Sequence, residues 1–264
     1  MSITWRLIDS GPTDAYMNMA VDEAIAISVI KGDVPPTLRF YQWQGPAISL
    51  GCYQRSEEVD LLYCRERNIP VVRRPTGGRA ILHGGDLTYS FSSKNTPPFF
   101  SDGLLKTYNH ISAAFLHALK GLGFPVVMKT RKEKGRVLTG SSICFQSVSF
   151  GEITIDNKKI IGSAQKRWTE GFLQQGSILL RLNAEEMLRV FRGSRTEEIT
   201  SSMTGLYHYR PSLDTERLKE MIRDAFEEAF GVDLNMAPLT EEEYSLAVKL
   251  RDEKYARQEW TLSR

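Results

Sequence analysis

Hydrophobic positions recur along this chain with two different periods, one typical of helices and one typical of strands. Spacings of three and four residues predict amphipathic helices over 13–32, 101–123 and 212–231, each of which ends at a glycine. A terminal helix over 240–260 opens with Thr240 three residues before Glu, the spacing of a capping box. Helices are therefore expected toward both ends of the chain, with one long helix near its middle.

Short runs rich in β-branched and aromatic residues fill much of the remaining sequence. Those at 38–43, 47–53, 71–74 and 87–92 predict strands of one sheet, and those at 5–9 and 176–182 predict further strands. The turn dipeptide Asp156-Asn157 separates the runs 145–155 and 159–162 and indicates a β-hairpin. Together these patterns favour a two-layer α+β fold.

The chain has no internal repeat, low-complexity stretch or Pro/Ser-rich linker. We therefore expect residues 1–264 to form a single domain, with a short helical C-terminal extension from about residue 212.

Composition and charge narrow the functional classes. The 264 residues carry 34 Lys and Arg against 32 Asp and Glu, so the net charge of +2 provides no global basic field for nucleic acid. The first residues reach Arg6 and Asp9 without an apolar run, and no segment has the length and apolarity of a membrane span. Three cysteines without a C-x-x-C pair argue against zinc or a disulfide framework. We expect a cytoplasmic monomer without a metal, a nucleic-acid partner or a membrane partner.

An arginine- and glycine-rich segment, RRPTGGRAILH from Arg73 to His83, is the most unusual part of the sequence. Its paired glycines would let backbone N–H groups approach an oxygen closely, and Arg73, Arg74 and Arg79 would add cations beside them. The segment therefore predicts a site for an anion or an acyl carbonyl. A glycine turn with solvated arginines explains the same spacing equally well.

Two further residues are candidates for chemistry. Lys159 lies on the strand that leaves the predicted hairpin, where its ammonium could face a developing oxyanion, although a solvated hairpin lysine is the more common case. Cys144 precedes that hairpin in Ser-Ser-Ile-Cys-Phe. A thiol accepts an acyl group when a nearby cation lowers its pKa, whereas a lone cysteine more often fills a core, as we expect of Cys52 and Cys64.

Taken together, these segments resemble the lipoate and octanoate attachment family, which shares its catalytic fold with biotin protein ligases. The resemblance covers nearly the whole chain and rests on the order and spacing of several motifs. They are Trp-Arg-Leu-Ile-Asp-Ser-Gly from Trp5, Asn18-Met19-Ala20 with Asp22-Glu23-Ala24, Leu38-Arg39-Phe40-Tyr41, the segment Arg73–His83, Lys159 with Gly162-Ser163-Ala164, Gln174-Gln175-Gly176-Ser177, and Lys254-Tyr255 with Glu259-Trp260. The resemblance implies an α+β catalytic domain with a mixed β-sheet and packed helices.

Within the family, the resemblance implies a cysteine-dependent octanoyltransferase rather than an ATP-using lipoate ligase. Arg79 stands where ligases usually have a third glycine, and too few residues follow Leu234 for the accessory domain on which those ligases generally depend. Cys144 resembles the nucleophile of the bacterial transferases. The implied catalytic residues are Cys144 and Lys159, and the implied substrate-binding residues are Arg73, Arg74, Thr76, Gly77, Gly78, Arg79, His83, Gly162, Ser163 and Gly176.

One departure from the family concerns the residue that follows His83. The family generally has Asp there, whereas this chain reads His83-Gly84-Gly85-Asp86. The contact of that carboxylate is therefore either lost or moved to Asp86.

The resemblance implies transfer of octanoate in lipoate biosynthesis, with acyl carrier protein as donor and no cofactor. The octanoyl group would pass through a Cys144 thioester to a lysine of a lipoyl-domain protein, such as the glycine cleavage H protein or the E2 subunit of a 2-oxoacid dehydrogenase. Lys159 would stabilise the oxyanion, and Arg73 and Arg74 would hold the glycine loop or contact the thioester. The basic run 129–136 could meet an acidic carrier protein, although a solvated loop explains it at least as well.

Three alternatives stay open. The first is an ATP- and Mg²⁺-dependent lipoate ligase, and the second is an amidotransferase that moves octanoate between lipoyl-domain proteins. The third is a non-catalytic relative that binds an acyl group or a partner.

Overall fold

A computed structural model describes residues 3–129 and 151–264, and the structural statements below concern those residues. Cys144 and most of the basic run 129–136 lie outside them.

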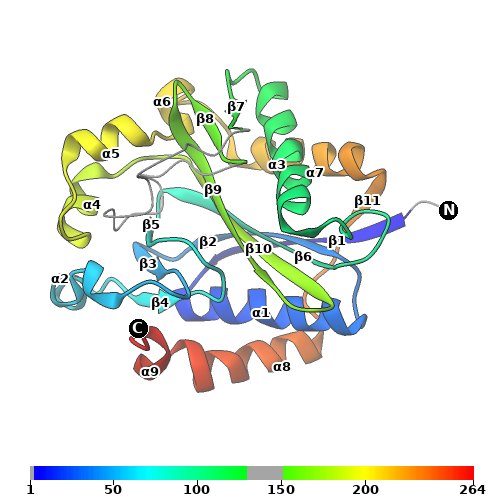
Figure 1. The fold of residues 1–264 in the computed structure, drawn as a ribbon, viewed down its shortest axis with the longest axis horizontal. Coiled ribbons are helices and arrows are strands. Elements are labelled where there is room, and N and C mark those ends of the chain that lie inside the picture. The colour runs from blue at the N-terminus through cyan, green and yellow to red at the C-terminus, as the bar shows by residue number, and fades with distance from the viewer. Residues whose placement is uncertain (1–2, 130–150) are drawn as a thin grey trace.

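A large mixed sheet forms the centre of the fold. Its strands are β1 (Ile3–Thr13), β2 (Thr37–Trp43), β6 (Asp86–Lys94), β7 (Val127–Met128), β8 (Ile153–Ile155), β9 (Lys158–Arg167), β10 (Gly171–Leu179) and β11 (Val232–Met236). Eight described strands lie in the order β11-β1-β2-β6-β10-β9-β8-β7 (Figure 1). β1 pairs in parallel with β2 and β11, and the other neighbours are antiparallel.

A second, smaller sheet contains β4 (Val71–Arg73), β3 (Ala47–Leu50) and β5 (Ile81–His83), in that order. The prediction of one sheet for 38–43, 47–53, 71–74 and 87–92 is therefore wrong, because the second and third of these runs belong to the small sheet. The chain leaves the large sheet after Trp43 through Gly45 and Pro46, and a proline has no N–H with which to continue a ladder. The small sheet carries the arginine- and glycine-rich segment beside the large one.

Helices cover both faces of the large sheet (Figure 1). The longer ones are α1 (Ala15–Lys31), α3 (Gly103–Gly121), α7 (Thr215–Phe230) and α8 (Glu241–Leu250). The short ones are α2 (Leu61–Glu66), α4 (Ala184–Val190), α5 (Thr196–Ser202), α6 (Leu206–Tyr209) and α9 (Gln258–Thr261). The α+β class and the mixed sheet are confirmed, but the fold has three layers rather than the expected two.

Side chains that alternate along each strand point to opposite faces of the sheet, so they pack against different helices. On β2, Leu38 and Phe40 join the apolar cluster under α3 and α7, whereas Tyr41 and Trp43 join the cluster with α1. α8 packs against the outer side of α1, so few side chains of α1 are exposed. No helix within 3–129 and 151–264 has the length and apolar character to cross a membrane.

The first three predicted helices end close to the observed ones, but the helix predicted over 240–260 is divided into α8, a π-helical segment (Arg251–Tyr255) and α9. α1 ends at Gly32 with φ of 91°, as expected, but its N-cap is Asp14, whose side chain accepts from the N–H groups of Tyr16 and Met17. The capping box of Thr240 and Glu243 is confirmed. The hairpin is also present, with Asp156 and Asn157 at φ of 50° and 64° between β8 and β9.

Candidate active site

The two neighbouring arginines of the predicted segment do different things. Arg73 is 1% exposed, and its guanidinium donates to the backbone carbonyls of Gly51 at 2.7 Å, Gln54 at 2.7 Å and Thr261 at 3.0 Å. The indole of Trp260 donates in return to the carbonyl of Arg73 at 2.8 Å. Arg73 therefore ties the C-terminal segment to the loop after β3.

Arg74 fixes the glycine-rich loop from within. Its Nη2 donates to the carbonyls of Gly77 and Arg79, both at 2.7 Å, and its Nη1 donates to the carbonyl of Ser49 at 2.8 Å. The loop also rests directly on Gly51, because a Cβ there would lie 1.8 Å from the carbonyl oxygen of Gly78. Only glycine at position 51 lets the loop approach so closely.

A narrow slot, named "the slot" below, lies between this loop and the central strands β9 and β10. It is lined by Met19, Tyr41, Trp43, Ser49, Arg74, Ile81, His83, Thr88, Gly162, Ser163, Ala164, Gln175, Gly176 and Ser177. Its cavity volume is about 20 Å³, which is room for about one water molecule. An acyl chain can therefore enter only after the lining side chains move.

The slot brings together some of the predicted site residues and not others. Those that line it are Arg74, His83, Gly162, Ser163 and Gly176. Those outside its described lining are Arg73, Thr76, Gly77, Gly78, Arg79 and Lys159. Gly77, Gly78 and Arg79 belong to the glycine-rich loop, Thr76 bonds that loop to Gln175, and Lys159 lies farther along β9.

His83 is held on both sides of its ring. Its Nδ1 lies 2.8 Å from Asp86 Oδ2, and its Nε2 lies 2.9 Å from Ser49 Oγ. The indole of Trp43 stacks on the imidazole with 3.9 Å between ring centroids. In this chain the carboxylate beside the imidazole is that of Asp86, three residues after His83.

Asp86 also accepts hydrogen bonds from the hydroxyls of Thr88 at 2.8 Å and Ser177 at 2.7 Å. Burial alone would raise the pKa of this carboxyl, but His83 and the two hydroxyl donors outweigh it, so the pKa of Asp86 lies below its ordinary value. The carboxylate therefore stays ionised, and it orients His83 through a contact behind the slot lining.

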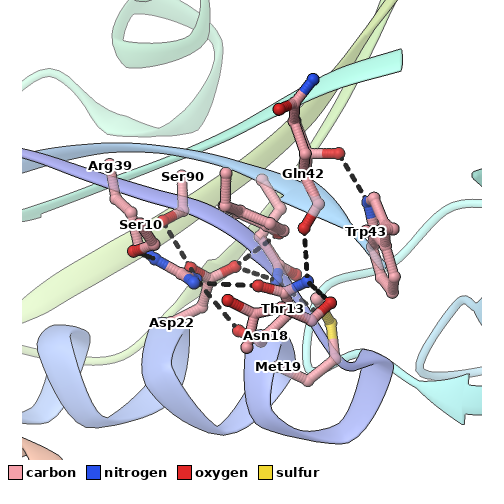
Figure 2. A network of polar contacts seen from close by, with 12 residues as sticks. Ser10, Thr13, Asn18, Met19, Asp22, Arg39, Gln42, Trp43 and Ser90 are labelled. Carbon is pink, nitrogen blue, oxygen red and sulfur yellow. Dashed lines mark hydrogen bonds and ion pairs between the residues drawn. The ribbon is translucent and has the colours of Figure 1, made fainter. Parts of the chain in front are cut away.

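A buried polar network behind the slot is centred on Asp22 of α1 (Figure 2). Asp22 accepts from Arg39 at 2.7 Å, Ser90 at 2.6 Å, Tyr41 at 2.8 Å and Gln175 at 2.7 Å. Burial, followed by the charge of Asp22, raises the pKa of Tyr41 well above its usual value, so its hydroxyl keeps its proton and donates.

The same network reaches the glycine-rich loop. Gln175 Oε1 accepts from the hydroxyl of Thr76 at 2.8 Å. Asp22, Gln175 and Thr76 thus connect α1, β10 and the loop in one chain of hydrogen bonds. Thr76, predicted to bind substrate, acts here on the loop's position.

Close packing narrows the slot at Gly176. A Cβ at this position would lie 2.2 Å from the ring of Tyr89 and 2.7 Å from Ser163 Oγ. The hydroxyls of Tyr89 and Ser163 are themselves 2.7 Å apart. Because its polar side chains bond one another, the slot presents satisfied groups and suits a neutral, apolar ligand better than an ion.

Lys159 is fully buried, with 0% of its surface exposed, and its ammonium forms an ion pair with Glu152, which is 4% exposed. The solvated-lysine interpretation is therefore wrong. Glu152 was not among the residues predicted from the sequence. Thr154 pairs with Lys159, but the register shifts between Ile153 and Thr154, so regular alternation along the hairpin does not place Glu152 beside Lys159.

The described cysteines differ in their chemistry. Cys64 is buried, and burial, followed by the charges of Asp60 and Glu186, raises the pKa of its thiol to about 11. Cys52 is half-buried in the loop after β3, with its N–H bonded to the carbonyl of Thr76. Cys64 is therefore unsuited to nucleophilic attack, and Cys52 is the described thiol nearer to the glycine-rich loop.

A model of the lipoyl protein ligase A/B catalytic domain matches residues 14–227. The chain belongs to this family.

Full-length relatives refine the assignment within the family. The chain is 39% identical to octanoyltransferase LipM of Kyrpidia tusciae, with 97% of this chain and 98% of the relative covered. It is 38% identical to octanoyltransferase LipM of Moorella thermoacetica, with 97% of each covered. These findings confirm the predicted family and the octanoyltransferase activity.

The fold is also that of a ligase. A bi-partite lipoate protein ligase from Thermoplasma acidophilum superposes with a TM-score of 0.80 and 25% identity, over 98% of this chain and 96% of the ligase chain. A ligase chain of this family can thus have nearly the same extent as this one. The small number of residues after Leu234 therefore does not separate transferase from ligase, and the similarity to the octanoyltransferase relatives carries that distinction.

Proposed function

We infer that this chain is an octanoyltransferase of lipoate biosynthesis that delivers octanoate to lipoyl-domain proteins. The full-length similarity to two octanoyltransferases carries this inference. The slot agrees with it, because its paired polar groups and its glycines at 162 and 176 suit an unbranched, uncharged acyl chain.

We propose acyl carrier protein as the donor and Cys144 as the nucleophile. The Cys144 thiolate attacks the thioester carbonyl of the donor, and the tetrahedral intermediate collapses with release of the carrier's thiolate, which takes up a proton. The ε-amine of the acceptor lysine then attacks the Cys144 thioester and loses a proton. An amide forms, and the Cys144 thiolate returns. Each step exchanges one acyl bond for another, so no ATP is consumed.

Lys159 would stabilise the negative charge of each tetrahedral intermediate. Its ammonium is already removed from water and held by Glu152, so little reorganisation is needed when charge develops nearby. We propose that Glu152 orients this ammonium.

Intact-mass spectrometry tests the covalent step. Incubated with octanoyl acyl carrier protein in the absence of ATP, the protein should gain one octanoyl mass, located on Cys144 by peptide mapping and released by hydroxylamine. Cys144→Ala should abolish the adduct and slow transfer to an acceptor domain by at least about 10³-fold, because the nucleophile is lost.

Cys52→Ala is the matched control, because Cys52 is the half-buried thiol beside the loop. It should keep the adduct. If Cys144→Ala transfers octanoate at the wild-type rate, the mechanism is wrong. If acylation requires ATP and free octanoate or lipoate, the ligase activity is the correct one.

A further inference from the structure

A second cavity, named "the arginine cleft" below, opens between α2 and α4. Its volume is about 390 Å³, within the range of about 300–1,000 Å³ that is usual for small-ligand sites. Its floor is apolar and includes Ile69, Leu179, Met187 and Met203, all of them buried. Unlike the slot, it has open volume of the size that a chain-like ligand needs.

The rim of the arginine cleft is cationic. It carries the exposed guanidinium groups of Arg67, Arg181 and Arg189, against one carboxylate, that of Glu186. Glu186 accepts a hydrogen bond from the hydroxyl of Tyr63 at 3.0 Å. The rim therefore has an excess of positive charge at the mouth of an apolar cavity.

Two of these arginines are held only by aromatic rings. Arg67 lies over the ring of Tyr63 at 5.8 Å, and Arg181 lies over the ring of Tyr207 at 5.5 Å. Neither forms an ion pair with another residue in the described part of the chain. Their N–H donors are consequently available for an anion, and a guanidinium presents them in a fork that matches phosphate oxygens.

The inner end of the arginine cleft reaches the candidate active site. Ile81 and His83 line both the cleft and the slot. The backbone of Met203, on the floor of the cleft, forms an isolated parallel β-bridge with that of Lys159. The N–H of Thr204 donates to the carbonyl of Lys159 at 3.2 Å. A ligand that entered past the arginines would thus approach both the slot and the strand of Lys159.

We propose that the arginine cleft holds the phosphopantetheine arm of the donor carrier protein, with Arg67 and Arg181 on its phosphodiester. The proposal rests on the proposed function and specifies its donor. The arm carries one negative phosphodiester at its protein end, a neutral amide chain and a thioester at its tip. That order matches a cationic rim, an apolar floor and an inner end beside the slot. An octanoyl-lysine of a lipoyl domain has no phosphate and gains nothing from this rim.

Two synthetic donors isolate the phosphate: octanoyl-4′-phosphopantetheine and octanoyl-pantetheine. The kcat/KM for octanoyl-enzyme formation should be about tenfold or more higher for the phosphorylated ester in the wild type. In the double variant Arg67→Gln, Arg181→Gln, that ratio should fall to near one. The variant should also lose efficiency with octanoyl acyl carrier protein by a similar factor.

Arg195→Gln is the matched control, because Arg195 is an exposed arginine of the same region and does not line the cleft. It should keep the wild-type ratio. Equal use of both esters by the wild type, or an unchanged ratio in the double variant, would overturn the cleft assignment while leaving the octanoyltransferase intact. No octanoyl adduct from any donor, the carrier protein included, would instead show that the proposed function is wrong.

Discussion

The slot and the arginine cleft are neighbouring cavities that share Ile81 and His83, yet they are built in opposite ways. The slot has almost no open volume, and polar side chains in its wall such as His83, Thr88 and Gln175 are fixed by several partners. The cleft is open, and two of its arginines contact aromatic rings and form no ion pair with residues 3–129 or 151–264.

This difference suggests a division of recognition between the two cavities. A neutral acyl chain carries no charge for the protein to recognise, so its selection depends on the shape of the slot and on apolar contacts with its wall. A phosphodiester is recognised by charge, which acts over a longer range and tolerates mobile side chains. Changes to the slot should therefore affect stability and catalysis, whereas changes to the cleft should affect donor choice.

The largest effect should come from the network behind the slot. Asp22→Asn removes the charge that neutralises Arg39 and replaces one acceptor oxygen by a donor. Removing one partner of a buried ion pair costs about 3–5 kcal/mol. We expect a loss of that size in the free energy of unfolding, measured by urea denaturation.

Arg181→Gln in the cleft is the comparison for that measurement and should change the free energy of unfolding by no more than about 0.5 kcal/mol. If Asp22→Asn lowers the free energy of unfolding as little as Arg181→Gln does, the buried charges do not stabilise the slot wall. The proposed difference between the two cavities would then be wrong.

Lys159 should come next in magnitude. Loss of a group that stabilises an oxyanion reduces the rate by about 10²–10³, or about 2.7–4 kcal/mol. We expect Lys159→Met to slow octanoyl-enzyme formation by this factor in single-turnover measurements. Lys158→Met, the adjacent half-buried lysine, should acylate at the wild-type rate.

Lys159→Met also removes the ammonium that Glu152 contacts, so some loss of stability is expected with it. The double variant Glu152→Gln, Lys159→Met should recover part of that stability while staying slow. Recovery of the acylation rate in the double variant would contradict the oxyanion role of Lys159.

Much of the fold is local enough to be predicted from the sequence. Gly32 ends α1 and Thr240 caps α8 because both act through neighbouring backbone groups. The separation of β3, β4 and β5 into a second sheet is not local. It depends on long-range pairing such as that of Ser49 with Ile81, which strand propensity does not encode.

The candidate site shows the same limit. The arginine- and glycine-rich motif indicated Arg74 and His83, which do line the slot. The order of residues in the motif did not distinguish them from Arg73, whose side chain contacts backbone carbonyls outside the slot. The Asp22 network and the cleft arginines join residues far apart in sequence, and no spacing between Arg67 and Arg181 marks them as neighbours.

The smallest effect should be a pH dependence at the base of the slot. The pKa of Asp86 is lowered in the folded protein, so its ionised form adds stability at pH values above the ordinary carboxyl pKa of 3.8. That contribution is lost as the pH falls through the folded-state pKa, where the carboxylate takes up a proton. Asn at this position has no such proton to bind.

Asp86→Asn should therefore be less stable than the wild type at neutral pH, and the gap should narrow as the pH falls below 3.8. Urea denaturation of both proteins between neutral pH and this acidic range measures the difference in stability directly.

Because Asp86 contacts His83, which also lines the cleft, the same variant tests whether the two cavities are coupled. If the slot wall is rigid and the cleft independent, Asp86→Asn should lower acylation from both synthetic thioesters equally. A selective loss of the phosphorylated ester would mean that the imidazole also organises the cleft.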